Sequence, residues 1–194
     1  MEFWGFSPDG KYLAFEQYGT RDGSGFPYAE LYGVEVARNV IVAAANVVIQ
    51  SDPTGPGEAR CRAFTQSQAA LRRYRIAQGN QGRFAGAVGK NHAAQSLEFS
   101  AAGATYTLEL TTLEAPASRN CLADPKLLEL RLSSGRNARV LQRDSRLPAS
   151  RACAHDYEIH SVFVLGSSLA VFVRVTRDGF EGWDLRWMVV TAQL

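Results

Sequence analysis

Short runs of aliphatic and aromatic residues recur along this chain in one plan: strand, tight turn, strand, polar loop, strand. The first unit joins Phe3–Phe6 to Lys11–Tyr18 through Ser-Pro-Asp-Gly, a hairpin turn because proline presets φ and glycine accepts positive φ. Strands over Ala29–Ala37 and Val40–Gln50 follow it. Similar units are expected over 96–142 and 157–192, so the pattern predicts antiparallel β-meanders.

The first and last units are the most alike. Thr-Arg-Asp-Gly occurs at Thr20–Gly23 and again at Thr176–Gly179, each time after an equivalent strand. This matching placement indicates a degenerate internal repeat and predicts that the two ends of the chain lie side by side. The strand Leu169–Val175 is apolar on both faces except at Arg174, so we expect it in the centre of its sheet.

A helix interrupts the β pattern over about Glu58–Ala77, after a segment rich in proline and glycine and before Gly79. Its apolar residues form one weak stripe at helical spacing, which favours a helix lying on a sheet surface. The stripe consists of Cys61, Phe64, Leu71 and Tyr74. The following stretch, Gln78–Asn91, is expected to be a loop because it is rich in glycine, asparagine and glutamine.

Length and composition fit one domain over residues 1–194. The chain is 46% hydrophobic and 21% charged, which is too apolar for a disordered chain. The longest apolar run, Val40–Ile49, is interrupted by Asn46 and is too short to span a membrane. We therefore predict a single mainly β domain of propeller-like blades, a barrel or a sandwich, with a helix and loop inserted at about 58–91.

The charge is uneven although the net charge is only +2. Residues 1–37 carry mostly acids, whereas Glu58–Lys90 carries mostly arginines. Aromatic residues do not alternate with these arginines as stacking platforms would, so a solvated helix face is favoured over a nucleic-acid surface. No nucleic-acid partner is predicted.

Two loops at equivalent places in the repeat are candidates for ligand binding. If the repeat units are adjacent, these loops face one another. Their candidate residues are Asp22, Asp178, Glu181, Trp183 and Asp184. The alternative account is that Asp and Gly only shape the turns while Trp183 covers the core.

A metal site is the second candidate. Asp156, Glu158 and His160 alternate along an expected strand and would project from one face. Ordinary solvent-facing polar residues are the alternative, because structural zinc sites prefer four nitrogen or sulfur ligands.

Standard catalytic signatures are absent from the sequence, and no cofactor is predicted. Gly86-Ala-Val-Gly-Lys-Asn is the nearest approach to a phosphate loop, but Phe84 stands at the first glycine position and Asn91 at the Ser/Thr position. The enzyme alternative is a hydrolase or metal-dependent enzyme whose loop acids, such as Glu16, Asp22 and Glu181, converge in space.

The three cysteines, Cys61, Cys121 and Cys153, allow one disulfide and one free thiol. Cys121 and Cys153 both lie in polar connections before apolar runs, so they are the expected pair. Two reduced, half-buried thiols are the alternative.

The segment Phe6-Ser-Pro-Asp-Gly-Lys-Tyr-Leu-Ala-Phe15, with Ala29-Glu-Leu-Tyr-Gly-Val-Glu-Val36, resembles one blade of the TolB-type β-propeller repeat. A longer resemblance rests on Gly5–Gly19, Asp22–Tyr28 and Gly179–Trp187. In these segments the chain is similar to a family of predicted secreted bacterial proteins, domain of unknown function 2259.

That resemblance implies export, with a leader that this chain lacks, and it favours the disulfide. It implies no reaction or ligand. We therefore expect a periplasmic or secreted, non-enzymatic binding or protein-interaction module, with a protein or small-molecule partner in the cell envelope.

Overall fold

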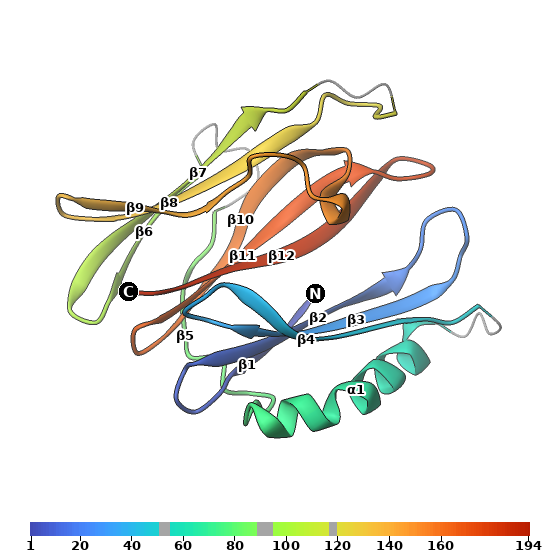
Figure 1. Cartoon of the computed structure of the whole chain (residues 1–194), viewed down its shortest axis with the longest axis horizontal. Helices are drawn as coiled ribbons and strands as arrows, with labels where there is room; N and C mark the ends of the chain where they lie inside the picture. Colours follow the sequence, from blue (N-terminus) through green and yellow to red (C-terminus); the bar gives the residue numbers. More distant parts are fainter. Residues whose placement is uncertain (51–54, 89–94, 117–119) are drawn as a thin grey trace.

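Strands that are neighbours in sequence pair antiparallel and build three four-stranded sheets in this computed structural model, which describes residues 1–50, 55–88, 95–116 and 120–194 (Figure 1). The first sheet contains β1 (Glu2–Phe6), β2 (Tyr12–Thr20), β3 (Pro27–Glu35) and β4 (Val40–Val48). The central sheet has the order β12 (Trp183–Gln193), β11 (Ser168–Asp178), β10 (Ala154–Leu165) and β5 (Arg83–Gly86). The third sheet contains β6 (Gln95–Ala101), β7 (Ala104–Glu114), β8 (Lys126–Ser134) and β9 (Asn137–Arg143).

The sheets are stacked, with the central sheet between the other two (Figure 1). The helix α1 (Pro56–Arg73) covers the outer face of the first sheet, and a short 3-10 turn, η1 (Ala149–Arg151), connects β9 to β10. Each sheet is open and ends in edge strands. Among the predicted alternatives, the architecture is therefore a layered sandwich. No helix in the described ranges is long and apolar enough to cross a bilayer.

The central strand β11 is buried on both faces. Leu169, Val171 and Val173 pack toward the third sheet, whereas Ala170 and Phe172 pack toward the first. These are alternate positions along one strand, as the period of two requires. The prediction that this segment is central in its sheet is confirmed.

Aromatic rings fill the layer between the first and central sheets. The Phe172 ring lies 5.0 Å from that of Phe3 and 5.7 Å from that of Phe15, measured between centroids. Such tilted and edge-on pairs stabilise a core by about 1 kcal/mol each beyond the burial of their area. This core joins the two ends of the chain.

Polar contacts also connect the ends. The Ser168 hydroxyl donates to the Gly10 carbonyl at 2.8 Å, and the Thr191 hydroxyl donates to the Val36 carbonyl at 2.8 Å. The mainly β class and the contact between the first and last units are both as predicted.

The predicted loop Gln78–Asn91 is wrong in part, because it contains β5. Arg83 and Phe84 pair with β10, and the Phe84 ring packs 5.6 Å from that of Phe163. Gly82 has φ 68°, and a Cβ there would lie 2.5 Å from the Val164 carbonyl oxygen. The glycine that suggested a loop is thus needed for close backbone approach. The end of the predicted loop, 89–91, lies outside the described residues.

The helix is fixed to the first sheet by one arginine. Arg60 donates two hydrogen bonds from Nε, both 3.1 Å long, and one from Nη2, 2.8 Å long, to Glu16, and it also pairs with Glu2. Its guanidinium lies 3.9 Å from the centre of the Tyr18 ring. The Glu16 side chain is only 2% exposed, and Arg60 lies against it as the counter-charge of a buried carboxylate.

We expect Arg60→Met to lower the free energy of unfolding by about 3 kcal/mol, because it leaves a buried carboxylate without its counter-charge. Chemical denaturation measures the change. The matched control is Arg62→Met, which removes an exposed pair with Glu58 and should cost about 0.5 kcal/mol or less. Equal losses in both variants would contradict this role of Arg60.

Candidate functional site

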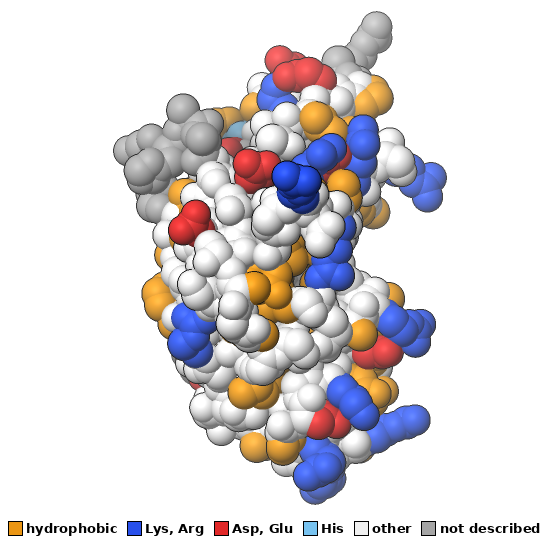
Figure 2. Space-filling view, turned by 90° about the vertical axis from the view of Figure 1, so that its left-hand side faces the viewer, with side chains coloured by type: hydrophobic (Ala, Val, Ile, Leu, Met, Phe, Trp, Pro, Cys, Tyr) orange, Lys and Arg blue, Asp and Glu red, His pale blue; other side chains and the backbone are white. Residues whose placement is uncertain are grey.

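A groove of about 880 Å³ lies where β12 ends the central sheet and the first sheet continues beside it. The apolar layer between these two sheets contains side chains of β1, β2 and β3. By contrast, β4 contributes Ile41 and Asn46 to the lining of the groove. Ser150 and Arg151 of η1 complete the lining from the side of the third sheet. Figure 2 shows the outline of the molecule indented along one margin, with Lys and Arg side chains above and below the indentation.

The edge of β12 points its backbone at the first sheet. The Trp187 N–H donates to Gln17 Oε1 at 3.1 Å, and the Thr191 N–H donates to Asn39 Oδ1 at 2.9 Å. In an antiparallel strand the N–H and C=O of every second residue point the same way. The backbone groups of Leu185 and Val189 therefore also point outward, away from β11.

The wall formed by the first sheet centres on Glu30. Its carboxylate accepts from Gln17 Nε2 at 2.7 Å, from the Tyr32 hydroxyl at 3.1 Å and from Asn46 Nδ2 at 3.4 Å. Burial, with the nearby Glu30 charge, raises the pKa of Tyr32 to about 12, so its phenol stays a neutral donor. All three partners of Glu30 are neutral groups.

The opposite wall carries a compact ionic cluster. Asp184 Oδ2 accepts from Arg177 Nη2 at 2.7 Å and from Arg186 Nε at 2.9 Å. The Arg186 guanidinium also lies 4.5 Å from the centre of the Tyr28 ring. Asp184 is thus compensated by two cations within its own hairpin.

Both ends of the groove are closed by contacts between distant segments. Asp22 accepts from the Phe180 N–H at 2.6 Å and the Glu181 N–H at 3.0 Å, so the two predicted loops face one another. These backbone donors, that of Glu181 first, hold the pKa of Asp22 below its ordinary value. At the other end, Asn39 donates to Gln142 of β9 at 3.3 Å.

The predicted loop residues are only partly brought together. Asp22, Asp178 and Asp184 line the groove. Glu181 contributes its backbone N–H to Asp22, and its side chain is exposed. Trp183 is 59% exposed, and its ring lies tilted beside that of His155 with 4.4 Å between the centroids, so the account in which Trp183 covers the core is wrong.

The proposed metal ligands on β10 have other contacts. Glu158 pairs with Arg174, Asp156 accepts from the Tyr157 N–H at 2.9 Å, and the His160 ring packs 4.4 Å from that of Trp187. Burial lowers the pKa of His160, which keeps its imidazole neutral. Metal binding at Asp156, Glu158 and His160 stays a prediction.

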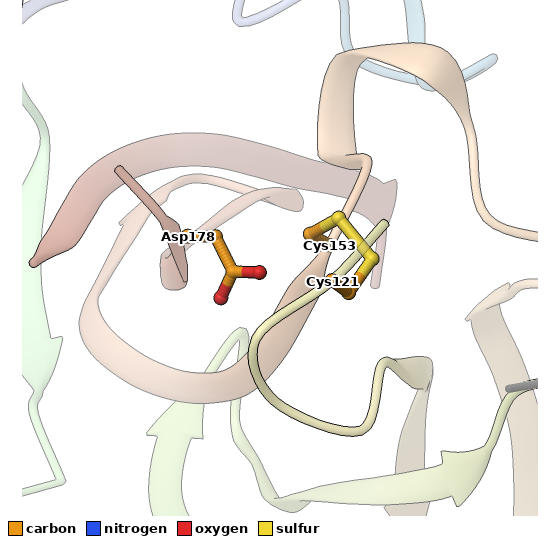
Figure 3. A group of neighbouring side chains, drawn as sticks. All are labelled: Cys121, Cys153 and Asp178. Carbon is orange, nitrogen blue, oxygen red and sulfur yellow. A yellow bond between two sulfur atoms is a disulfide. The ribbon is translucent and has the colours of Figure 1, made fainter. Parts of the chain in front are cut away.

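A different group of potential ligands lies near the end of β11. In the described ranges, Cys121, Cys153 and Asp178 are the three such residues whose ligand atoms all lie within 4.8 Å of one another. The two sulfur atoms are bonded to each other, as Figure 3 shows, so neither is a free thiolate. The group is therefore a disulfide beside a carboxylate, which accepts from the Leu122 N–H.

The disulfide between Cys121 and Cys153 confirms the predicted pairing and leaves Cys61 free and exposed on α1. It joins the β7–β8 connection to the residues that follow η1. Arg151 of η1 donates to both oxygens of Asp144, at 2.6 and 2.7 Å. The disulfide and this buried ion pair brace the groove on the side of the third sheet.

Of the acids named for the enzyme alternative, Glu16 lies apart from Asp22 and Glu181. Glu16 faces α1 and pairs with Arg60, whereas Asp22 contacts the β11–β12 hairpin. The acids that do line the groove are held by hydrogen bonds or ion pairs.

Sequence reasoning missed most of the groove residues, because they lie within strands rather than in loops. The missed residues include Gln17, Glu30, Tyr32, Asn46 and Arg186. The sequence signal that could have identified them is a polar residue on the inward face of a strand. Gln17 of β2 and Glu30 of β3 are examples, and they lie opposite each other in the sheet.

The family comparison fits this β-rich, disulfide-bonded chain. Residues 14–193 match the family model described as "Predicted secreted protein (DUF2259)". The chain belongs to this family. No curated protein and no solved structure matches it.

Family membership indicates where the protein is located and gives no information on a reaction or a ligand. The description agrees with the predicted export to the periplasm or medium, where a disulfide persists. It names no reaction and no ligand, so the function has to be argued from the groove. The propeller-blade resemblance of the first strands stays a prediction.

We expect the double variant Cys121→Ser/Cys153→Ser to lower the free energy of unfolding by about 3 to 4 kcal/mol, because the bond closes a loop over a sequence separation of 32 residues. Chemical denaturation of the oxidised protein and the variant tests this. Cys61→Ser is the control and should leave the midpoint unchanged. An unchanged midpoint in the double variant would overturn the expectation.

Asp22 should close the groove in a pH-dependent way. Its pKa is lowered from 3.8, so the contact is present above this value and is lost as the pH falls through the lower folded-state pKa. We expect the Phe180 and Glu181 amide resonances to shift on acidification below pH 3.8, and Asp22→Asn to cause a comparable shift at neutral pH. Asp9→Asn, in the β1–β2 turn, is the control; the same shifts in this variant would refute the assignment.

Proposed function

We propose that this protein is an exported, non-enzymatic binding module that holds its ligand in the groove beside β12. Asp22, Asp178 and Asp184 of the predicted ligand set belong to this groove, together with Gln17, Glu30 and other residues of the first sheet. The partner in this proposal is a protein or small molecule of the cell envelope, because the family is described as secreted.

One observation carries the proposal: the groove combines an open strand edge with exposed apolar side chains. Ile41 is 60% exposed on its wall, and Met188 and Val189 of β12 also line the groove. Exposed apolar surface beside unpaired hydrogen-bonding groups is typical of a binding site. The volume of about 880 Å³ lies within the usual range for ligand sites.

The ionic groups of the groove favour binding over catalysis. A general acid or base needs a carboxyl with a pKa near the working pH, whereas the pKa of Asp22 is lowered by backbone donors. Asp184 is compensated by two arginines, and Glu30 accepts from three neutral donors. These arrangements suit recognition, because they fix polar groups in place.

Nuclear magnetic resonance titration of the oxidised chain tests the proposal. Separate pools of neutral saccharides, free amino acids and short peptides serve as probes, and the amides of Leu185, Trp187 and Val189 report on the groove. We expect at least one pool to shift these amides, with an at least tenfold weaker dissociation constant in Ile41→Glu. Val140→Glu is the matched control, since Val140 is 44% exposed on another edge strand, β9.

Two results would overturn the proposal. One is that no pool shifts the groove amides. The other is turnover of chromogenic ester, phosphate-ester or glycoside substrates that Asp178→Asn abolishes.

A further inference from the structure

We propose that the occupant of the groove is an extended polypeptide segment of about six residues, which adds to the edge of β12 as a fifth strand of the central sheet. This inference rests on the proposed function and specifies its ligand. The segment carries an apolar side chain against Ile41 and a basic side chain opposite Glu30.

The outward-pointing backbone groups of β12 support the addition of a strand. The outward N–H of Trp187 and Thr191 are satisfied by side-chain oxygens of Gln17 and Asn39. Within the described ranges, the outward groups of Leu185 and Val189 have no such partner. Leu185 and Val189 lie on either side of Trp187, so open and occupied outward positions alternate along the strand. The side-chain amides of Gln17 and Asn39 bind where a peptide group would, and an added strand takes the place of the Gln17 amide at Trp187.

β12 is a long, regular edge strand, and side chains of the first sheet cap it at Trp187 and Thr191. It pairs with β11 over its whole length, from Trp183 to Gln193, in an unbroken register without a bulge. By contrast, the edge of β1 is covered, because the Gly79 N–H donates to the Trp4 carbonyl at 2.9 Å. Proteins normally shorten, bend or cover an edge strand, and a long regular one is a template for pairing.

The closed ends of the groove set the length of the segment. Between the Asp22 contact and the Asn39 contact, β12 runs through Asp184–Val189. Six residues in extended conformation span about 20 Å. A segment of this length fits a chain terminus or an extended loop.

The charges of the groove specify the side chains. Asp184 already has Arg177 and Arg186, whereas Glu30 has only neutral donors and no ion pair within the described residues. Arg186 acts on Glu30 at a distance without pairing with it, so a lysine or arginine on the bound segment would supply a direct ion pair. Ile41, exposed beside Met188 and Val189 in the lining, offers the apolar contact.

The test begins with a displayed library of random seven-residue peptides. The oxidised full chain is immobilised through the free thiol of Cys61, which lies on α1, on the face of the first sheet opposite the groove. We expect enrichment of peptides that combine a basic and an apolar residue. Enriched peptides are then synthesised, and their dissociation constants are measured in solution by calorimetry.

Backbone pairing is tested on the peptide itself. Each residue is N-methylated in turn, which removes one N–H donor at a time. We expect at least tenfold weaker binding at alternate positions and little change at the positions between, because only every second N–H of an added strand faces β12. Equal effects at consecutive positions, or none, would overturn strand addition.

Substitutions in the groove test the contribution of the protein to binding. Leu185→Pro removes an outward N–H on an edge strand, where proline is tolerated, and should weaken binding at least tenfold, whereas Leu185→Val should not. Glu30→Gln should abolish the preference for lysine over glutamine in the peptide. Val140→Glu, on β9, should leave binding unchanged, and a comparable loss there would count against the groove.

The two proposals fail differently. If saccharides or amino acids shift the groove amides and no peptide is enriched, the peptide inference is wrong and the binding module stands. If peptides bind but the shifts lie outside the groove, both are wrong.

Discussion

The burial of β11 on both faces is the constraint on which the rest of the structure depends. A strand with Val171 and Val173 on one side and Phe172 on the other cannot face water in either direction. The central sheet therefore needs a cover on each face, and the two other meanders of the chain provide them. The first sheet in turn needs α1, because its outer face is also apolar at Ala14 and Leu31.

The groove is a consequence of how these layers are placed. Phe15 and Val34 of the first sheet pack on the central sheet, while Glu30 and Asn46 lie beyond its edge and stay polar. One part of the inward face of the first sheet thus belongs to the core, and the other part lines the groove. Gln17 lies at the boundary, where it both caps β12 and donates to Glu30.

The parts of the fold that could be predicted are those specified by residues that are close together in the sequence. Ser7-Pro8-Asp9-Gly10 specifies its turn, and the alternation in Leu169–Val175 specifies a strand buried on both sides. β5 could not be predicted, because its pairing partner is distant in sequence and its glycines have the composition of a loop. Asp22, Asp178 and Asp184 were found through the repeat, whereas Glu30 and Arg186 required the relative placement of two sheets.

The order of the strands has a consequence for how the chain reaches this structure. The inner face of the first sheet, with Phe3 and Phe15, is covered by Ala170 and Phe172, which are synthesised about 150 residues later. Its apolar side stays uncovered until the C-terminal third of the chain is present, so closure of the core comes last. Because β12 is the last strand of the chain, its edge is also the last part of the groove to be synthesised.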